Sequence, residues 1–312
     1  MILQCRSGIS QAVERGIYMP ALGTHVIQAK KCFEEIHSEV EIDRDFLGAS
    51  AISHDTMALL PGGYFRCFVE AHETKTDAYF LALIQHIKNE GLREDANAMA
   101  FLYGQVMHYA LDTKTHPLIY YMTECHPAKF FVSALGAHTL FEAWYDVCRE
   151  EEEKSREGEA FNPKYPFVKK VGDGGIDPMI DAVYKAVYGL ENAAKGYKNG
   201  IKTWEIYQAR LRGLMLKHAK KYHSDFEGML NSGGVHFLHP VTNVPLNTTF
   251  DEAYKNSISL ACELIEAVNG NIYGGASNED MLQAAFGNSY DTGEDWRRPE
   301  PKRYFMGYPI KK

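Results

Sequence analysis

The sequence predicts an all-α protein, a multi-helix bundle with long loops on one side. Apolar residues recur at helical spacing through most of the chain, whereas the alternation of apolar and polar residues that is typical of strands is scarce. No internal repeat or low-complexity tract stands out. The chain has 312 residues, of which 45% are hydrophobic, so it is long enough to bury a sizeable core.

The predicted helices each have an apolar face, and in chain order they are 24–36, 77–89, 95–116, 133–153, 179–197, 203–222 and 250–270. The third is mostly apolar, which predicts a central helix that is buried on most sides. It should end near His116, because Pro117 disfavours helical geometry in the residue before it. The last begins with a capping box, Thr249 with Glu252, and should close at Gly270.

The chain is predicted to fold as one all-α domain over residues 19–290. Residues 1–18 are interpreted as an N-terminal extension, with Met19 as an alternative start, and residues 291–312 as a C-terminal tail. Within the domain, the segment 154–178 is rich in glycine, proline and charge, which predicts an irregular connection or insertion.

Composition excludes some function classes and favours a compartment. The net charge is -8 and there is no long basic tract, which argues against a dedicated duplex-DNA binder. The sequence contains no run of about 18 apolar residues, so no membrane-spanning helix is predicted. The first twenty residues lack the apolar centre of an export signal and carry Glu14, so we expect a cytoplasmic protein. The six cysteines show no CxxC spacing, which favours reduced thiols.

The stretch HYALDTKTH places three polar residues on the predicted central helix. His108, Asp112 and His116 are four residues apart, and each such step rotates by about 40° on a helix, so they share one face. Imidazole and carboxylate are ligands that suit zinc. Two interpretations stay open at this point: a metal-binding face, or buried histidines bonded to the main chain with a paired carboxylate.

A second pair with the same spacing lies on the next predicted helix. His138 and Glu142 are four residues apart in AHTLFEAWYD, which by itself is compatible with ordinary packing. Two helices that each turn such a pair inwards are, however, how helix bundles build metal sites with several ions.

Three further residues complete a candidate set. His25 begins an amphipathic helix after Thr24, His72 precedes the helix that starts near Asp77, and Asp55 lies in a segment of small residues. His54, directly before Asp55, has equally suitable chemistry, and the residues themselves do not separate the two. The other histidines show surface, helix-end or loop positions without a partner at ligand spacing.

The ordered set His25, Asp55, His72, His108–Asp112–His116 and His138–Glu142 resembles the zinc-dependent phospholipase C family. The resemblance runs from Met19 to Glu142 through MPALGTH, FLGASAISHD, AHE, YGQVMHYALDTKTHP and AHTLFEAWYD, and continues more weakly in FDEAYKNSISLACELIEAVNG and FGNSYDTG. That family is distantly similar to the single-strand-specific zinc nucleases.

The resemblance implies an all-α fold that holds three zinc ions. By position, one zinc would be held by Asp55, His72, His108 and Asp112. A second would be held by His116, His138 and Glu142. The third would take His25 and share Asp112 as a bridging carboxylate. Asp55 would also act as the catalytic general base, or would orient the attacking water.

One departure from the family concerns the third ion. In secreted members an N-terminal tryptophan, exposed by processing, also holds this zinc through its amino group and carbonyl, whereas this chain has Met19-Pro20 and eighteen residues before it. If translation starts at Met19, the amine of Pro20 would be free to complete the site. With the extension in place, two zinc ions are expected rather than three.

The leading functional interpretation is a zinc-dependent phosphoric-ester hydrolase of phospholipase C type, acting on a lipid or small-molecule phosphodiester, with transient contact to a membrane surface. One alternative is a single-strand nuclease, for which Tyr64, Phe65, Tyr120, Tyr121 and Trp144 offer stacking surfaces. Another is a non-catalytic zinc-binding helical protein. Duplex nucleic acid is not an expected partner, and the sequence does not address the oligomeric state.

Overall fold

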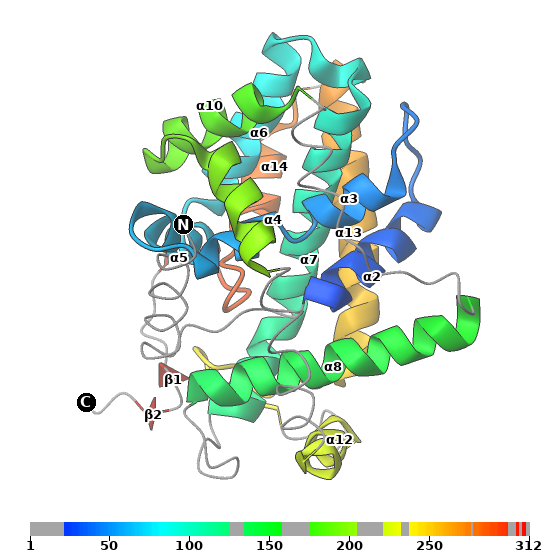
Figure 1. The fold of residues 1–312 in the computed structure, drawn as a ribbon, viewed down its shortest axis with the longest axis vertical. Helices are drawn as coiled ribbons and strands as arrows, with labels where there is room; N and C mark the ends of the chain where they lie inside the picture. Colours follow the sequence, from blue (N-terminus) through cyan, green and yellow to red (C-terminus); the bar gives the residue numbers. More distant parts are fainter. Residues whose placement is uncertain are drawn as a thin grey trace.

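The computed structural model describes residues 22–124, 134–157, 175–204, 221–231, 237–275, 277–298, 304–305 and 308–309. These residues form a helical bundle, which confirms the all-α prediction (Figure 1). The strands within the described residues are two antiparallel pieces of two residues each, β1 (Tyr304–Phe305) and β2 (Tyr308–Pro309). None of the described helices is both long and apolar enough to cross a membrane.

The labelled helices, in chain order, are α2 (Leu22–Glu35), α3 (Arg44–Ser50), α4 (Ser53–Thr56), α5 (Gly63–Glu73), α6 (Thr76–Asn89), α7 (Ala96–Glu124), α8 (Ala134–Glu157), α10 (Asp177–Tyr188), α12 (His223–Asn231), α13 (Phe250–Ile272) and α14 (Glu279–Ala285). Two 3-10 turns, Met57–Leu59 and Leu92–Glu94, join some of them, and residues 193–204 form a further helical stretch.

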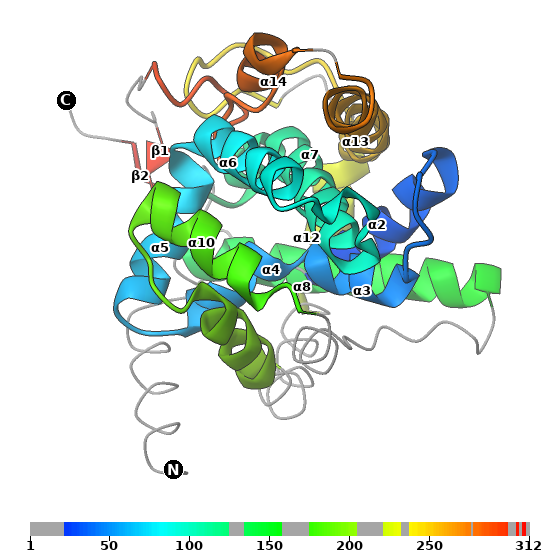
Figure 2. The same cartoon turned by 90° about the horizontal axis from the view of Figure 1, so that it is seen from above.

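Helix α7 is the centre of the bundle, as predicted. It packs against α13, α3, α8 and α2, and the view from above shows neighbours around it (Figure 2). Its residues from Ala98 to Ala110 are almost all buried in the main core, and Leu111, Leu118, Ile119 and Met122 belong to a second core formed with α8 and α13. Polar residues on α7 are therefore held in an interior that excludes water.

The prediction that this helix ends near His116 is wrong. Helix α7 continues through Pro117 to Glu124. A proline within a helix costs roughly 3 kcal/mol, but burial of a large aliphatic side chain contributes about 1.5–3 kcal/mol, and Leu118, Ile119 and Met122 are all buried beyond it. Tertiary packing therefore outweighs the local preference.

Other boundaries differ from the predictions for local reasons. Helix α10 ends at Tyr188 instead of continuing to 197, because Gly189 takes a left-handed conformation with φ of 66° and caps it. Helix α8 extends to Glu157, into the segment predicted to be irregular. Helix α13 has the predicted capping box, Thr249 with Glu252, but continues past Gly270 to Ile272. Most of the predicted helix 203–222 lies outside the described residues, as do 158–174 and the extension 1–18.

The segment after α14 packs back onto the helices that frame α7. The main-chain N–H of Tyr290 and the hydroxyl of Ser289 both donate to the carbonyl of His72, at 2.9 and 3.1 Å. The indole of Trp296 donates to Asp77 at 2.9 Å. This turn therefore closes one side of the region around His72. The cysteines that the structure describes, Cys32, Cys67, Cys148 and Cys262, are free thiols.

Candidate metal centre

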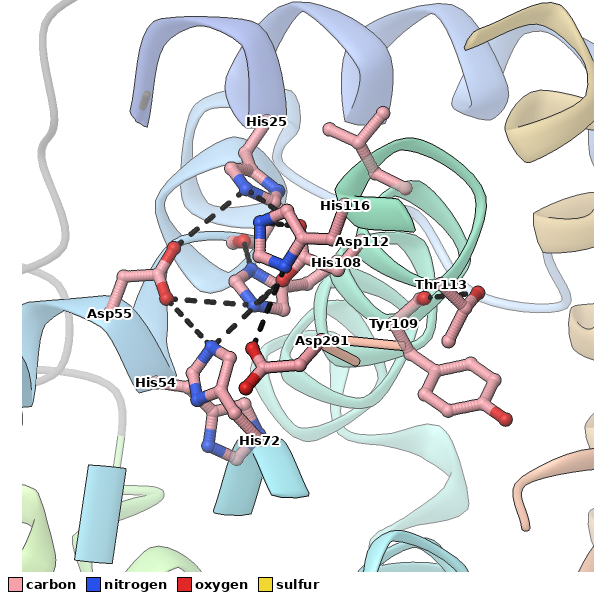
Figure 3. Close-up of polar contacts among 12 residues, drawn as sticks. His25, His54, Asp55, His72, His108, Tyr109, Asp112, Thr113, His116 and Asp291 are labelled. Atoms are coloured by element: carbon pink, nitrogen blue, oxygen red, sulfur yellow. Dashed lines mark hydrogen bonds and ion pairs between the residues drawn. The ribbon is translucent and has the colours of Figure 1, made fainter. Parts of the chain in front are cut away.

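The structure brings all eight predicted ligands together in the interior of the bundle. Four elements besides α7 contribute: His25 lies in the first turn of α2, Asp55 in α4, His72 in the last turn of α5, and His138 and Glu142 on α8. Helix α7 contributes His108, Asp112 and His116 from one face. All eight side chains are buried, and Figure 3 shows six of them converging.

Asp55, His72, His108 and Asp112, named here the first cluster, have their polar atoms at ligand-like separations. The His72 Nε2–Asp55 Oδ1 and His108 Nε2–Asp112 Oδ2 distances are both 3.0 Å, and the cross distances from these nitrogens to the other carboxylate are 3.7 and 3.9 Å. Zinc with ligands at about 2.0–2.1 Å in a tetrahedron separates them by about 3.3 Å. The first cluster therefore has the dimensions of a zinc site.

Main-chain carbonyl groups determine which ring nitrogen of His72 and of His108 carries the hydrogen. His72 Nδ1 donates to the carbonyl of Phe68 at 2.8 Å, and His108 Nδ1 donates to that of Ala51 at 2.6 Å. Because a carbonyl only accepts, each Nδ1 carries a hydrogen. In a neutral ring each Nε2 lone pair would point at a carboxylate oxygen 3.0 Å away, an arrangement that calls for a proton or a metal cation between the two atoms.

His116, His138 and Glu142 form a second cluster at the α7–α8 contact. Glu142 Oε1 lies 3.0 Å from His138 Nε2 and 3.6 Å from His116 Nε2. The two clusters meet at Asp112, whose Oδ1 lies 3.6 Å from His116 Nε2. The three residues of the second cluster form a compact group of potential ligands, which matches the set that the resemblance assigns to one zinc.

His25 lies beside the first cluster and on the Asp112 oxygen that faces the second. Its Nε2 is 3.3 Å from Asp112 Oδ1 and 3.7 Å from Asp55 Oδ2, and its ring stacks on that of His108 at 4.3 Å. This place is compatible with a third ion that shares Asp112. In this position His25 also forms a group of potential ligands with Asp55 and His108. Pro20, the predicted partner of that ion, lies outside the described residues.

Four of the unsatisfied atoms in this region fit a bound metal, namely Asp55 Oδ2, His108 Nε2, Asp112 Oδ2 and Glu142 Oε2, whereas in His25, His116 and His138 the unsatisfied Nδ1 is not the nitrogen that faces a carboxylate of the two clusters. Among the described residues, every predicted ligand except His72 has a buried side-chain atom without a hydrogen-bond partner: His25 Nδ1, Asp55 Oδ2, His108 Nε2, Asp112 Oδ2, His116 Nδ1, His138 Nδ1 and Glu142 Oε2. Buried polar atoms are rarely left unpaired, because their desolvation is then uncompensated. The carboxylates and imidazoles present are the donors that zinc uses.

Electrostatics in the metal-free chain show how strongly these groups interact. Burial lowers the pKa of His108, but the carboxylates of Asp112 and Asp55 outweigh burial and raise the pKa to about 9. Burial would raise the pKa of Asp112, yet His116, His108 and His25 hold it far below its usual range. Burial, reinforced by His108, lowers the pKa of His25 to about 4. The carboxylates therefore attract positive charge to this interior.

In the structure the side chains of Asp55 and its neighbour His54 have different partners. The Nδ1 of His54 is hydrogen-bonded to the hydroxyl of Tyr184 at 2.6 Å, and burial holds the pKa of His54 well below its usual value. His54 belongs to none of the groups whose atoms converge on a metal position. Of the other histidines, His37 is exposed and His239 contacts the carbonyl of Thr292, whereas His126, His218 and His236 lie outside the described residues.

Sequence reasoning missed two carboxylates at the edge of this region. Asp291 points towards His116, with 3.8 Å between its Oδ1 and His116 Nδ1 (Figure 3). Asp146 on α8 contacts the first turn of α2. The only sequence signal for Asp291 was the weak resemblance in FGNSYDTG, whereas Asp146 ends the motif AHTLFEAWYD and continues the i, i+4, i+8 spacing of His138 and Glu142, a signal that was overlooked.

Comparison with known families decides what kind of protein carries this arrangement. A family model described as zinc dependent phospholipase C matches residues 24–189, more than half of the chain. The chain belongs to the zinc-dependent phospholipase C family. Comparison with curated proteins and with solved structures gave no match. Membership confirms the resemblance and makes the chain a zinc-dependent hydrolase of phosphoric esters, and the matched stretch contains all eight predicted ligands.

Proposed function

We propose that this chain hydrolyses a phospholipid, or a related phosphodiester, with two or three zinc ions held by the eight converging side chains. The observation that carries the proposal is the continuous group of buried donors from His72 to His138, joined through Asp112. Four of these side chains have an unpaired buried atom that faces the group, among the described residues: Asp55 Oδ2, His108 Nε2, Asp112 Oδ2 and Glu142 Oε2. The first cluster would hold one ion, the second cluster another, and His25 with Asp112 a third.

Each part of the chain has a separate task in this proposal. Zinc bound by these side chains would supply a nucleophilic water near neutral pH and would withdraw charge from the phosphate. The main-chain carbonyls of Phe68 and Ala51 orient His72 and His108. Asp55 Oδ2 is unpaired and lies 3.7 Å from His25 Nε2, which places an acceptor for a proton at the junction of the ligands. Asp55 is therefore proposed as the general base or the group that orients the water.

A small cavity of about 20 Å³ lies where the two clusters meet. It is bordered by His25, Asp112, His116 and Glu142 on one side, and by an apolar wall on the other: Leu111, Ile119, Phe141 and Phe250. Its volume corresponds to about one water molecule. The apolar wall lowers the local polarity, which strengthens electrostatic interactions with a charged phosphate.

A single-strand nuclease of the same fold is the second candidate, and one residue favours it. Tyr120 is half-buried, with its ring 4.9 Å from that of His138 and 5.8 Å from that of His116. A base stacked on Tyr120 would bring its phosphate to the second cluster. Trp144 does not offer the same surface, because it is buried and its indole donates to His223.

Metal analysis combined with two substrates tests the proposal. We expect at least two zinc ions per chain and EDTA-sensitive hydrolysis of p-nitrophenyl phosphorylcholine that exceeds hydrolysis of bis-p-nitrophenyl phosphate and of single-stranded DNA. The opposite preference would favour the nuclease, with loss on Tyr120→Ala as its signature. Bound zinc without turnover would favour a non-catalytic zinc protein. No stoichiometric zinc after reconstitution would contradict the proposal.

A further inference from the structure

The carboxylate of Asp146 caps a helix to which it does not belong. Asp146 lies on α8, one turn after Glu142, and is 8% exposed. Its Oδ1 accepts from the main-chain N–H of Thr24 at 2.6 Å and from the Thr24 hydroxyl at 2.7 Å, and its Oδ2 accepts from the N–H of Gly23 at 3.0 Å. These N–H groups lie in the first turn of α2, where a helix provides them with no partner.

Gly23 permits this close contact. A Cβ at position 23 would lie 3.0 Å from the Asp146 Cγ and 3.0–3.1 Å from both carboxylate oxygens. A Cβ there would force the carboxylate to shift by a few tenths of an ångström, which would strain its hydrogen bonds to α2. The contact therefore depends on three residues together: an acceptor at 146, a hydroxyl at 24 and no side chain at 23.

The capped turn carries a predicted ligand. His25 follows Thr24 directly, and its Nε2 lies 3.3 Å from Asp112 Oδ1. A helix turns by about 100° per residue, so a small rotation of α2 would move this nitrogen away from Asp112. The same α8 segment that holds the first turn of α2 also carries Glu142 of the second cluster.

We propose that Asp146 is a positioning residue for His25, which holds the first turn of α2 against α8 so that the His25 imidazole meets Asp112. The proposal rests on the proposed function in one respect, because it takes His25 as a zinc ligand. It adds a residue whose carboxylate hydrogen-bonds to Gly23 and Thr24 and acts through the helix end.

A double-mutant cycle on zinc affinity tests this role. By competition with a chelator, Asp146→Ala should lower the affinity of the zinc that takes His25 by about 10- to 100-fold, the usual effect of an outer partner of a ligand. In a His25→Ala background, Asp146→Ala should lower zinc affinity by less than about threefold, because the imidazole that Asp146 positions is then absent. Asp280→Ala, an exposed aspartate in the first turn of α14, is the matched control and should have no effect.

Variants of Thr24 and Gly23 give graded evidence and replace Asp146→Ala if that chain fails to fold. Thr24→Ser keeps the hydroxyl and should bind zinc as the unmodified chain does, whereas Thr24→Val and Gly23→Ala should each show a loss smaller than that of Asp146→Ala. Losses that add to that of His25→Ala, or an unchanged affinity in both Asp146→Ala and Gly23→Ala, would overturn the proposal.

Amide hydrogen exchange in the metal-free chain separates this inference from the proposed function. Asp146→Ala should speed exchange at residues 23–26 at least tenfold, and leave residues 108–112 on α7 unchanged. An unmodified chain that binds no zinc contradicts the proposed function, and the exchange result alone then decides whether Asp146 fixes α2. Unchanged exchange at 23–26 overturns that inference whether or not zinc binds.

Discussion

The first and second clusters contain the same residue types but are held in place differently. In the first, His72 and His108 donate their Nδ1 hydrogens to main-chain carbonyls. In the second, the Nδ1 atoms of His116 and His138 have no hydrogen-bond partner within the described part of the chain, and the acceptor facing His116 is Asp291 at 3.8 Å. Main-chain partners fix ring orientation before a metal arrives. The first cluster is therefore the more preorganised of the two.

The largest effect should come from the residue that joins the two clusters. Asp112→Asn removes a charged ligand from both sides, and we expect kcat/KM to fall by roughly a thousandfold, which is about 4 kcal/mol in the activation barrier. Asp251→Asn, an exposed residue on α13, is the matched control and should leave kcat/KM unchanged. Metal analysis should show fewer bound zinc ions in Asp112→Asn. A variant with full metal and full activity would show that Asp112 does not bridge.

The difference in preorganisation predicts that zinc leaves in two stages. During titration with a chelator, we expect the second cluster to lose its ion at a chelator concentration about 10- to 100-fold lower than the first cluster. His138→Ala should abolish the early stage, and His72→Ala the late stage. If His72→Ala abolishes the early stage instead, the order of the two clusters is reversed.

Zinc affinity should rise with pH, by about tenfold per pH unit for each proton released. In the metal-free chain the pKa of His108 is raised above its usual 6.5 to about 9. His108 is therefore protonated at pH 7, and zinc must displace that proton. The part of the gain that comes from His108 should continue from pH 7 to pH 9 and then level off. His25, with a pKa of about 4, is already neutral and should release none. Calorimetry in buffers of different ionisation enthalpy counts these protons, and zero release at pH 7 would contradict the prediction.

The smallest expected change concerns the carboxylate that faces the second cluster. Asp291→Asn should weaken zinc at the second cluster by about tenfold, because the acceptor for His116 Nδ1 loses its charge, and should leave the first cluster unchanged. Asp280→Asn on α14 serves as the control. Chelator titration measures both stages separately. An equal shift of both stages would mean that Asp291 supports the fold as a whole and not His116.

The all-α fold and the convergence of His108, Asp112 and His116 were predictable because helical periodicity is local. The end of α7 was not, because burial of Leu118 and Met122 beyond Pro117 depends on packing against distant helices. The sequence could not decide whether His54 or Asp55 faces the metal ligands. The structure distinguishes them because Tyr184, 130 residues away, is hydrogen-bonded to the ring of His54. Asp146 and Asp291 act across more than 100 residues, and no spacing along the chain indicates such pairs.

Helix α7 has a consequence for the substrate as well as for the metals. His108, Asp112 and His116 stand on one continuous helix, and each step of four residues advances about 6 Å along its axis. The offset between the two clusters is thus determined by helical pitch and not by loops. Insertion of one residue between 112 and 116 would turn His116 by about 100° out of the second cluster. Loops can therefore change in sequence to accept other head groups, while the distance between the two clusters that would bind a phosphate stays constant.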